Sequence, residues 1–255
     1  FYSVLKNMEN EKGDGRISHL VHARGFDIDL RNDAMYKVVY RHLAAAADEL
    51  GCPLIRVSTN VREVTRGYAS WGRLQHGAAL AGIGHCLSGL FRTMLIPATH
   101  TYEHLFPWGT HPQLDPLWSD ESLTFVSDGC EASRTQKIIR QIARSGAALK
   151  HLRVCYRKTG AERNCGQCEK CLRTMVGLKI AGVLDECGAF TDSLDLDRIR
   201  KIRIKQRITE SFARDTLTEL RERGSEPELQ QAMSEILSHW TFSRIRNHLK
   251  DRFRF

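Results

Sequence analysis

Four cysteines lie within 17 residues, and they constrain the fold of this 255-residue chain more than any other feature. They are separated by nine, two and two residues: Cys155, Cys165, Cys168 and Cys171. Four thiolates arranged as a tetrahedron are the usual ligands of a structural Zn²⁺ ion. A Cys-x-x-Cys step can form a tight turn, and Gly166 in that turn permits backbone angles that other residues resist. The spacing therefore predicts that these four cysteines bind one Zn²⁺.

Two other interpretations of the cysteines stay open at this point. An iron–sulfur cluster of the ferredoxin type requires a further cysteine soon after the third, usually followed by proline, whereas Leu172, Arg173 and Thr174 follow here. The thiols can also be inert core residues that lie close in sequence by chance. If the site is zinc, its four protein ligands leave no open coordination position, so we expect it to be structural and not catalytic.

The other four cysteines are scattered in apolar contexts, where we expect small buried hydrophobic residues: Cys52, Cys86, Cys130 and Cys187. The opening FYSVLKNMEN has no basic start, no long apolar stretch and no small-residue cleavage site, so it does not resemble a secretory signal. Clustered thiols without such a signal favour a metal site in a reducing, cytoplasmic location. No apolar run approaches the roughly eighteen residues that cross a bilayer.

Strand-like and helix-like segments alternate along the first part of the chain. The strand-like segments are 17–26, 53–58, 93–98, 123–127 and 152–156, and the helices between them cover 32–50, 75–90 and 133–145. This order predicts an α/β fold, a parallel sheet with helices on both faces. After Cys171 we expect only helices, at 172–183, 208–223, 227–239 and 241–250. The expected domains are 1–150 (α/β), 151–185 (the cysteine loop and its helix) and 186–255 (a basic helical appendage).

The net charge of +8 is concentrated near the end of the chain, because residues 198–255 hold 14 Lys or Arg and 8 Asp or Glu, a difference of +6. A basic run of this kind can contact RNA, and the candidate residues are Arg198, Arg200, Lys201 and Arg203. The alternative is a solvated face with Ile199, Ile202 and Ile204 turned inward. No aromatic residues interleave with the run, which weakens the case for base stacking.

Ligands of parallel α/β sheets bind beyond the carboxyl ends of the strands. Thr99, His100 and His104 follow one predicted strand, and a histidine there can contact phosphate or transfer protons near neutral pH. Surface histidines with ordinary partners are the alternative. His111 and Asp115 lie in a loop rich in Pro, Trp and Gly, which is typical of a substrate lid. In the alternative, tryptophans hold this loop down and Asp115 bonds its own backbone.

Ser133, Arg134 and Lys137 open the helix that follows Asp128 and Gly129. A helix N-terminus with basic residues suits an anion. The alternative is a serine cap followed by two solvated bases.

The segment NCGQCEKCLRT, preceded by Cys155, resembles the zinc motif of the PP-loop ATP pyrophosphatases that include the 7-cyano-7-deazaguanine synthases. This family belongs to the adenine nucleotide alpha hydrolase-like (HUP) superfamily. HARGFDIDL is similar to the family's second-strand segment, and SRTQKIIRQI is similar to the helix before its zinc loop. The resemblance covers about residues 1–185. It implies that Gly25, Phe26 and Asp27 contact adenine and ribose, although an ordinary strand-to-loop turn also explains them.

The resemblance also implies ATP, Mg²⁺ and Zn²⁺ as cofactors. Thr99, Ser133 and Lys137 would then contact ATP, and His100, Asp115 and Arg134 would act in catalysis. A carboxylate or carbonyl oxygen of a small molecule or modified base would attack the α-phosphate of ATP and release pyrophosphate. A nitrogen or sulfur nucleophile would then displace AMP and form an amide, a nitrile or a thio group.

Two departures from the family pattern limit what can be carried over. The Ser-Gly-Gly-x-Asp-Ser loop that binds pyrophosphate is absent, and we expect it, with the first strand, immediately upstream of Phe1. Without that loop we expect this chain to be inactive. The synthases' substrate-recognition segments are also absent, and PATHTYEHLFPWGTHPQLDPLWSD stands in their place. We therefore expect ATP-dependent activation and not deazaguanine synthesis.

Other functions stay open as well. The chain can be a non-catalytic, zinc-stabilised module that binds nucleic acid or protein, or a relative that thiolates tRNA. The partners that we expect are a small-molecule substrate and, as a further option, a second copy of the chain in a homodimer. We expect no membrane partner.

Overall fold

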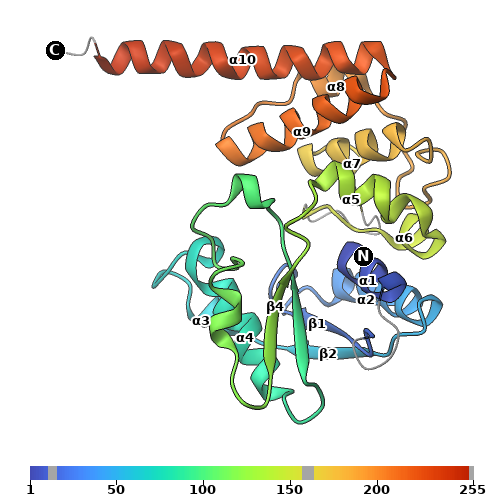
Figure 1. The fold of residues 1–255 in the computed structure, drawn as a ribbon, viewed down its shortest axis with the longest axis vertical. Helices are drawn as coiled ribbons and strands as arrows, with labels where there is room; N and C mark the ends of the chain where they lie inside the picture. Colours follow the sequence, from blue (N-terminus) through green and yellow to red (C-terminus); the bar gives the residue numbers. More distant parts are fainter. Residues whose placement is uncertain (11–15, 157–163, 253–255) are drawn as a thin grey trace.

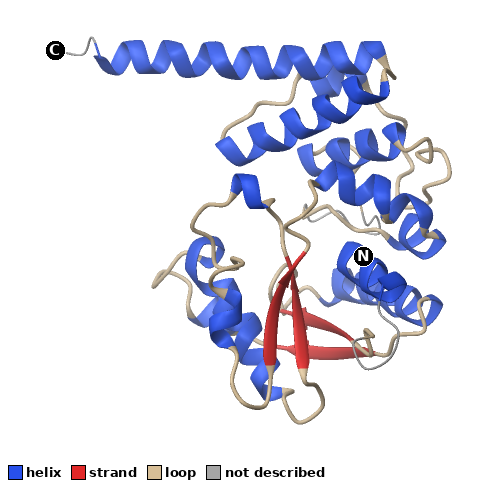
Figure 2. Ribbon diagram, in the orientation of Figure 1, coloured by secondary structure: helices blue, strands red, loops and turns tan. Residues whose placement is uncertain are grey.

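The computed structural model describes residues 1–10, 16–156 and 164–252, with side chains for residues 1–9, 16–156 and 164–241. The described chain forms two layers, an α/β layer from the first half and a helical layer from the second half (Figure 1). In the α/β layer, strands β1 and β2 and strands β3 and β4 lie among helices (Figure 2). In the helical layer, the long C-terminal helix α10 lies farthest from the strands (Figure 1).

The four strands form two small parallel sheets. β1 (Leu20–Arg24) pairs with β2 (Leu54–Ser58), and β3 (Thr93–Pro97) pairs with β4 (Thr124–Asp128). The predicted parallel order is therefore confirmed. One continuous sheet is not present among the described residues, because no backbone ladder joins the two pairs.

Helices α1 (Tyr2–Asn10), α2 (Asp33–Glu49), α3 (Val61–Val64) and α4 (His76–Cys86) belong to the α/β layer. Asn32 caps α2, because its side-chain oxygen accepts a hydrogen bond from the Met35 N–H at 3.1 Å. A π-helical turn, η1 (Trp71–Gln75), leads into α4. A Cβ at Gly84 would lie 2.5 Å from the Phe125 ring, so this glycine lets α4 pack closely on β4. The core between them contains Ala81, Ile96, Leu123 and Phe125.

The predicted fifth strand at 152–156 is wrong. α5 (Arg134–Arg140), the 3₁₀ turn η4 (Ile142–Arg144) and α6 (Gly146–His151) precede an extended segment that pairs with no described strand. The N–H groups of Val154 and Cys155 bind the side chain of Asn164 instead. Short 3₁₀ turns also form at η2 (Tyr102–His104) and η3 (Asp115–Trp118).

The helical layer contains α7 (Glu169–Ile180), α8 (Leu196–Arg200), α9 (Arg207–Arg223) and α10 (Pro227–Arg252). α9 ends at Gly224, whose φ of 62° is left-handed. α10 runs without a break, so the predicted interruption near residue 240 is wrong. The buried face of this layer includes Leu172, Ile199, Leu220, Leu229 and Ala232. Within the described chain, no helix is both long and apolar enough to cross a bilayer.

The basic run is partly engaged in ion pairs. Arg198 pairs with Asp192 and Asp195, and Arg200 pairs with Asp197 and Glu235. Lys201 and Arg203 are exposed, while Ile199 and Ile204 are buried and Ile202 is half-buried. The inward-turned isoleucines of the alternative interpretation are therefore observed.

Three of the scattered cysteines are buried as predicted: Cys52, Cys130 and Cys187. The prediction is wrong for Cys86, which is exposed because it lies in the last turn of α4.

Candidate metal centre and active site

The four clustered cysteines converge, and their sulfur atoms all lie within 4.8 Å of one another. Sγ–Sγ distances are 3.9 Å from Cys155 to Cys168, 3.9 Å from Cys165 to Cys171 and 3.5 Å from Cys168 to Cys171. A disulfide would need about 2.05 Å. A zinc tetrahedron with Zn–S bonds of about 2.3 Å has edges of about 3.8 Å. The donor set and its spacing thus fit a tetrahedral metal ion such as Zn²⁺.

Local geometry explains why these segments deliver four sulfurs to one point. Cys168 is the N-cap residue of α7 and Cys171 lies in its first turn, so the two share one end of the helix. The Cys168 N–H points at the sulfur of Cys165 at 3.3 Å. Gly166 between them has a φ of 64°, the left-handed backbone predicted for this turn. Cys155 arrives from the extended segment after α6, and it is as fully buried as Cys171.

Asn164 joins the two halves of this centre. Its side-chain oxygen accepts hydrogen bonds from Val154 N–H (2.9 Å) and Cys155 N–H (3.2 Å), and its amide donates to the carbonyls of Leu152 (2.8 Å) and Ala189 (2.9 Å). Asn164 was not predicted as a site residue. The one feature of the sequence that points to it is its position, immediately before the second cysteine.

The contact between two thiols of the cluster shifts their pKa values in opposite directions. Their hydrogen bond lowers the pKa of Cys168 and raises the pKa of Cys171. Thiolates are the form that coordinates metal, so binding of a cation would displace the thiol protons that the cluster shares without it.

A second group of residues gathers at the carboxyl ends of β3 and β4. They line one narrow cleft together with residues of α9. The residues before α9 that line it are 99–101, His104, Ser133 and Arg134. His100 is 8% exposed, and neither ring nitrogen has a hydrogen-bond partner among the described residues. Burial, and then the charges of Arg134 and Lys137, lower its pKa to about 4. The His100 ring is therefore neutral at pH 7, with one nitrogen able to donate and the other to accept.

Arg134 and Lys137 are not the solvated bases of the alternative interpretation. The Nε of Arg134 is buried without a hydrogen-bond partner in the described structure. Lys137 is buried, its Nζ donates to the Ala98 carbonyl at 2.8 Å, and burial lowers its pKa to about 8. Ser133 is a helix cap, because it forms a capping box with Gln136. α5 itself is a short helix of 7 residues.

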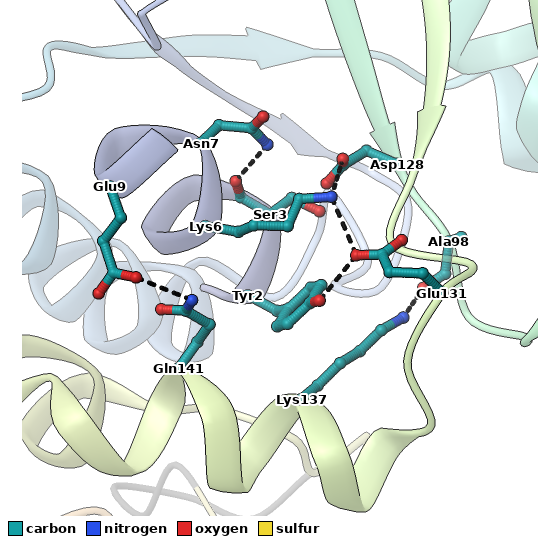
Figure 3. A network of polar contacts seen from close by, with 10 residues as sticks. All are labelled: Tyr2, Ser3, Lys6, Asn7, Glu9, Ala98, Asp128, Glu131, Lys137 and Gln141. Atoms are coloured by element: carbon teal, nitrogen blue, oxygen red, sulfur yellow. Dashed lines mark hydrogen bonds and ion pairs between the residues drawn. The ribbon is translucent and has the colours of Figure 1, made fainter. Parts of the chain in front are cut away.

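A polar network beside this cleft was not predicted. Lys6 of α1 donates to Asp128 (2.5 Å) and to Glu131 (3.0 Å), and the Tyr2 hydroxyl donates to Glu131 at 2.7 Å (Figure 3). Lys137 lies across the same space from Tyr2, with its Nζ 5.3 Å from the ring centroid. The second carboxylate oxygen of Asp128 is buried without a partner in the described part of the chain. α1 therefore contributes a cation and a phenol to the strand ends.

Asp115 and His111 do not line the cleft. Asp115 is fully buried and its oxygen accepts the His111 N–H at 2.9 Å, as in the alternative interpretation. Trp108 of the same loop packs against His76 and Phe106. Burial raises the pKa of Asp115. Its second oxygen has no hydrogen-bond partner in the described structure.

Gly25, Phe26 and Asp27 lie at the end of β1, on the other pair of strands, and do not line the cleft. Gly25 has a φ of 100°, and a Cβ there would lie 1.9 Å from the Thr59 carbonyl oxygen. Phe26 contacts Trp71 edge-on at 4.8 Å, and its carbonyl accepts a hydrogen bond from Arg62. Asp27 is exposed. The turn is thus a tight, glycine-dependent structure with one exposed carboxylate.

Comparison with known proteins identifies no relative. No protein-family model matches the chain, and no match is found among curated proteins or solved structures.

Proposed function

We propose that this chain belongs to a zinc-stabilised PP-loop ATP pyrophosphatase that activates a carboxylate or carbonyl oxygen of its substrate by adenylylation. The proposal rests on the resemblance of the cysteine motif and on one observation in the structure. Buried polar groups without partners meet largely buried cations at the carboxyl ends of β3 and β4.

An unsatisfied buried polar group costs roughly 1–3 kcal/mol, so several in one place are expected to serve a ligand. Both nitrogens of His100 and the Nε of Arg134 are such atoms in the cleft, and one oxygen of Asp128 is another at the end of β4. Together they can satisfy a ligand that accepts and donates hydrogen bonds and carries negative charge. A triphosphate with its reacting partner has these properties.

In the proposed reaction the substrate oxygen attacks the α-phosphorus, and the bond from that phosphorus to the pyrophosphate oxygen breaks. Negative charge then develops on the leaving pyrophosphate and on the α-phosphate oxygens. Catalysis of this kind depends on positioning and charge neutralisation. Arg134 and Lys137 supply positive charge at the strand ends, and the neutral His100 supplies a hydrogen bond without repelling them.

If Mg²⁺ binds, it would supply positive charge that offsets the negative charge of the phosphate groups, and Asp128 would help to hold it. The unpartnered oxygen of Asp128 is an acceptor of the type that Mg²⁺ prefers. The four-cysteine centre has no open position when all four thiolates bind, so its proposed role is to hold α7 and the loop before it against the α/β layer.

The experiment is ATP–pyrophosphate exchange by the protein expressed from its complete gene, with Mg·ATP and a panel of small carboxylic acids and amides. We expect labelled pyrophosphate to enter ATP only when one class of substrate is present. Arg134→Gln should lower the exchange rate at least about 100-fold, as expected for loss of a charge that stabilises the transition state. Arg140→Gln, on the same helix but exposed, should leave it unchanged. Absence of ATP binding by calorimetry, together with absence of exchange, would refute the proposal.

A further inference from the structure

Two arginines from different helices share one aromatic ring at the edge of the cleft. The guanidinium carbon of Arg173 in α7 lies 4.3 Å from the ring centroid of Phe212 in α9, and that of Arg134 in α5 lies 5.3 Å from it. The ring of His100 is parallel to the same phenyl ring within 5°, with centroids 6.1 Å apart. The helical layer therefore completes the cleft at the strand ends, which sequence reasoning did not foresee.

Few carboxylates pair directly with these arginines. The Arg173 side chain is only 13% exposed, and its ion-pair partner is Glu169, at 2.9 Å. Arg134 forms no ion pair in the described structure, and its Nε is buried without a hydrogen bond. Asp215 also lines the cleft, and burial raises its pKa. Two largely buried guanidinium groups thus share one directly paired carboxylate.

Like charges held near one ring in a desolvated position are unfavourable unless an anion joins them. Guanidinium groups bind carboxylate and phosphate oxygens through parallel hydrogen bonds, and aromatic stacking holds their planes in place. The unpartnered nitrogens of His100 belong to a side chain that is nine-tenths buried, in the cleft that Arg134 and Phe212 also line. They add a neutral hydrogen bond to the same ligand.

We propose that Arg134 and Arg173 form a clamp for an oxyanion of the substrate, so that the substrate of the reaction proposed above is an acid. The identification of the bound oxyanion as a substrate rests on the proposed function. The existence of the oxyanion site does not depend on it. The shared chemistry is a carboxylate or phosphate group held beside Phe212, with His100 as a hydrogen-bond partner. Because Arg173 lies two residues after Cys171 in α7, the metal centre also fixes the position of one arm of the clamp.

The test uses inorganic phosphate and acetate as probes, titrated into the full chain by calorimetry at constant ionic strength. We expect at least one probe to bind. Arg134→Gln and Arg173→Gln should each weaken that binding tenfold or more, whereas Arg140→Gln should not change it. Binding of phosphate alone indicates a phosphorylated substrate, and binding of acetate as well indicates a carboxylic acid. Absence of binding by both probes, or equal binding by all three variants and the unaltered protein, would overturn the clamp.

Arg134→Lys is the control for unfolding, because it keeps the positive charge and most of the side-chain packing at this position. Its binding should be weaker than that of the unaltered protein and stronger than that of Arg134→Gln, with unchanged far-ultraviolet circular dichroism. A separate titration with Mg·ATP distinguishes the two proposals. Oxyanion binding without ATP binding would refute the proposed function and leave the clamp intact, whereas ATP binding without an arginine-dependent oxyanion site would refute only the clamp.

Discussion

The side-chain oxygen of Asn164 accepts a hydrogen bond from the backbone N–H of Cys155, at 3.2 Å. This contact ties the first cysteine of the metal centre to the residue immediately before the second one. The same side chain reaches Leu152 and Ala189, so the extended segment after α6 is held by one amide and not by a neighbouring strand.

Replacing Asn164 with alanine should therefore weaken both the fold and the metal centre. The change leaves buried backbone groups without hydrogen-bond partners. Each group that water cannot reach should lower the free energy of unfolding by about 1–3 kcal/mol. Loss of a residue that orients a metal ligand typically lowers metal affinity by about 10–100-fold. Urea unfolding and competition with a chromogenic zinc chelator measure the two effects. Asn7→Ala, which removes only a contact to the Ser3 carbonyl, is the matched control. Equal chelator curves for the two variants would contradict this role.

Replacing Gly25 with alanine tests the turn at the end of β1. Both Gly25 and Gly51 have positive φ, so each alanine variant carries the left-handed cost of about 1–2 kcal/mol. A Cβ at Gly51 meets nothing within 4 Å, whereas one at Gly25 meets the Thr59 carbonyl oxygen. We expect Gly25→Ala to lower the free energy of unfolding by clearly more than Gly51→Ala does. If chemical denaturation gives the same value for both, the close approach of β1 and β2 at this turn is not as described.

The network around Glu131 predicts a particular loss of stability in acid. Burial alone would raise its pKa, but hydrogen bonds from Tyr2 and Lys6 outweigh that effect and lower the pKa to about 2. A carboxyl whose folded pKa is depressed stabilises the fold above its unfolded pKa of about 4.3, and loses that contribution as the pH falls toward 2. The side chain is 43% exposed, so solvent screening keeps the effect small.

We therefore expect the difference in unfolding free energy between the unaltered protein and Glu131→Gln to shrink from pH 6 to pH 2.5. Glu121→Gln, at an exposed position, should show no such trend. A difference that stays constant with pH would argue against the Tyr2–Glu131–Lys6 network.

Removing one thiolate tests the closed character of the metal centre. Cys168→Ser should lose bound metal and unfold at a lower temperature, because metal binding stabilises the folded state. A strong chelator should lower the melting temperature of the unaltered protein toward that of the variant and leave the variant unchanged. Cys86→Ser, at an exposed position outside the cluster, should behave as the unaltered protein. A chelator effect of equal size in Cys168→Ser would show that the metal is held elsewhere.

Local signals in the sequence predicted local features well. The glycine turn at Gly166 and the convergence of four cysteines both depend on neighbouring residues, and the structure contains both of them. Parallel pairing of the strands also followed from their alternation with helices.

Features that depend on distant partners were not predictable in the same way. The segment 152–156 has a strand-like composition, but its N–H groups bind Asn164, which no periodicity reveals. Phe212 lines the cleft, and Arg173 stacks on its ring, only because the helical layer packs over the strand ends. Asp115 is buried by its own loop and not displayed at the cleft, since one carboxylate oxygen accepts the His111 N–H.

X-ray absorption at the zinc K-edge of the purified protein tests the metal centre most directly. We predict one zinc per chain with four sulfur neighbours at about 2.3 Å and no lighter ligand in the first shell. A sample without zinc, or with nitrogen or oxygen among the nearest neighbours, would contradict the four-thiolate centre on which the rest of the account depends.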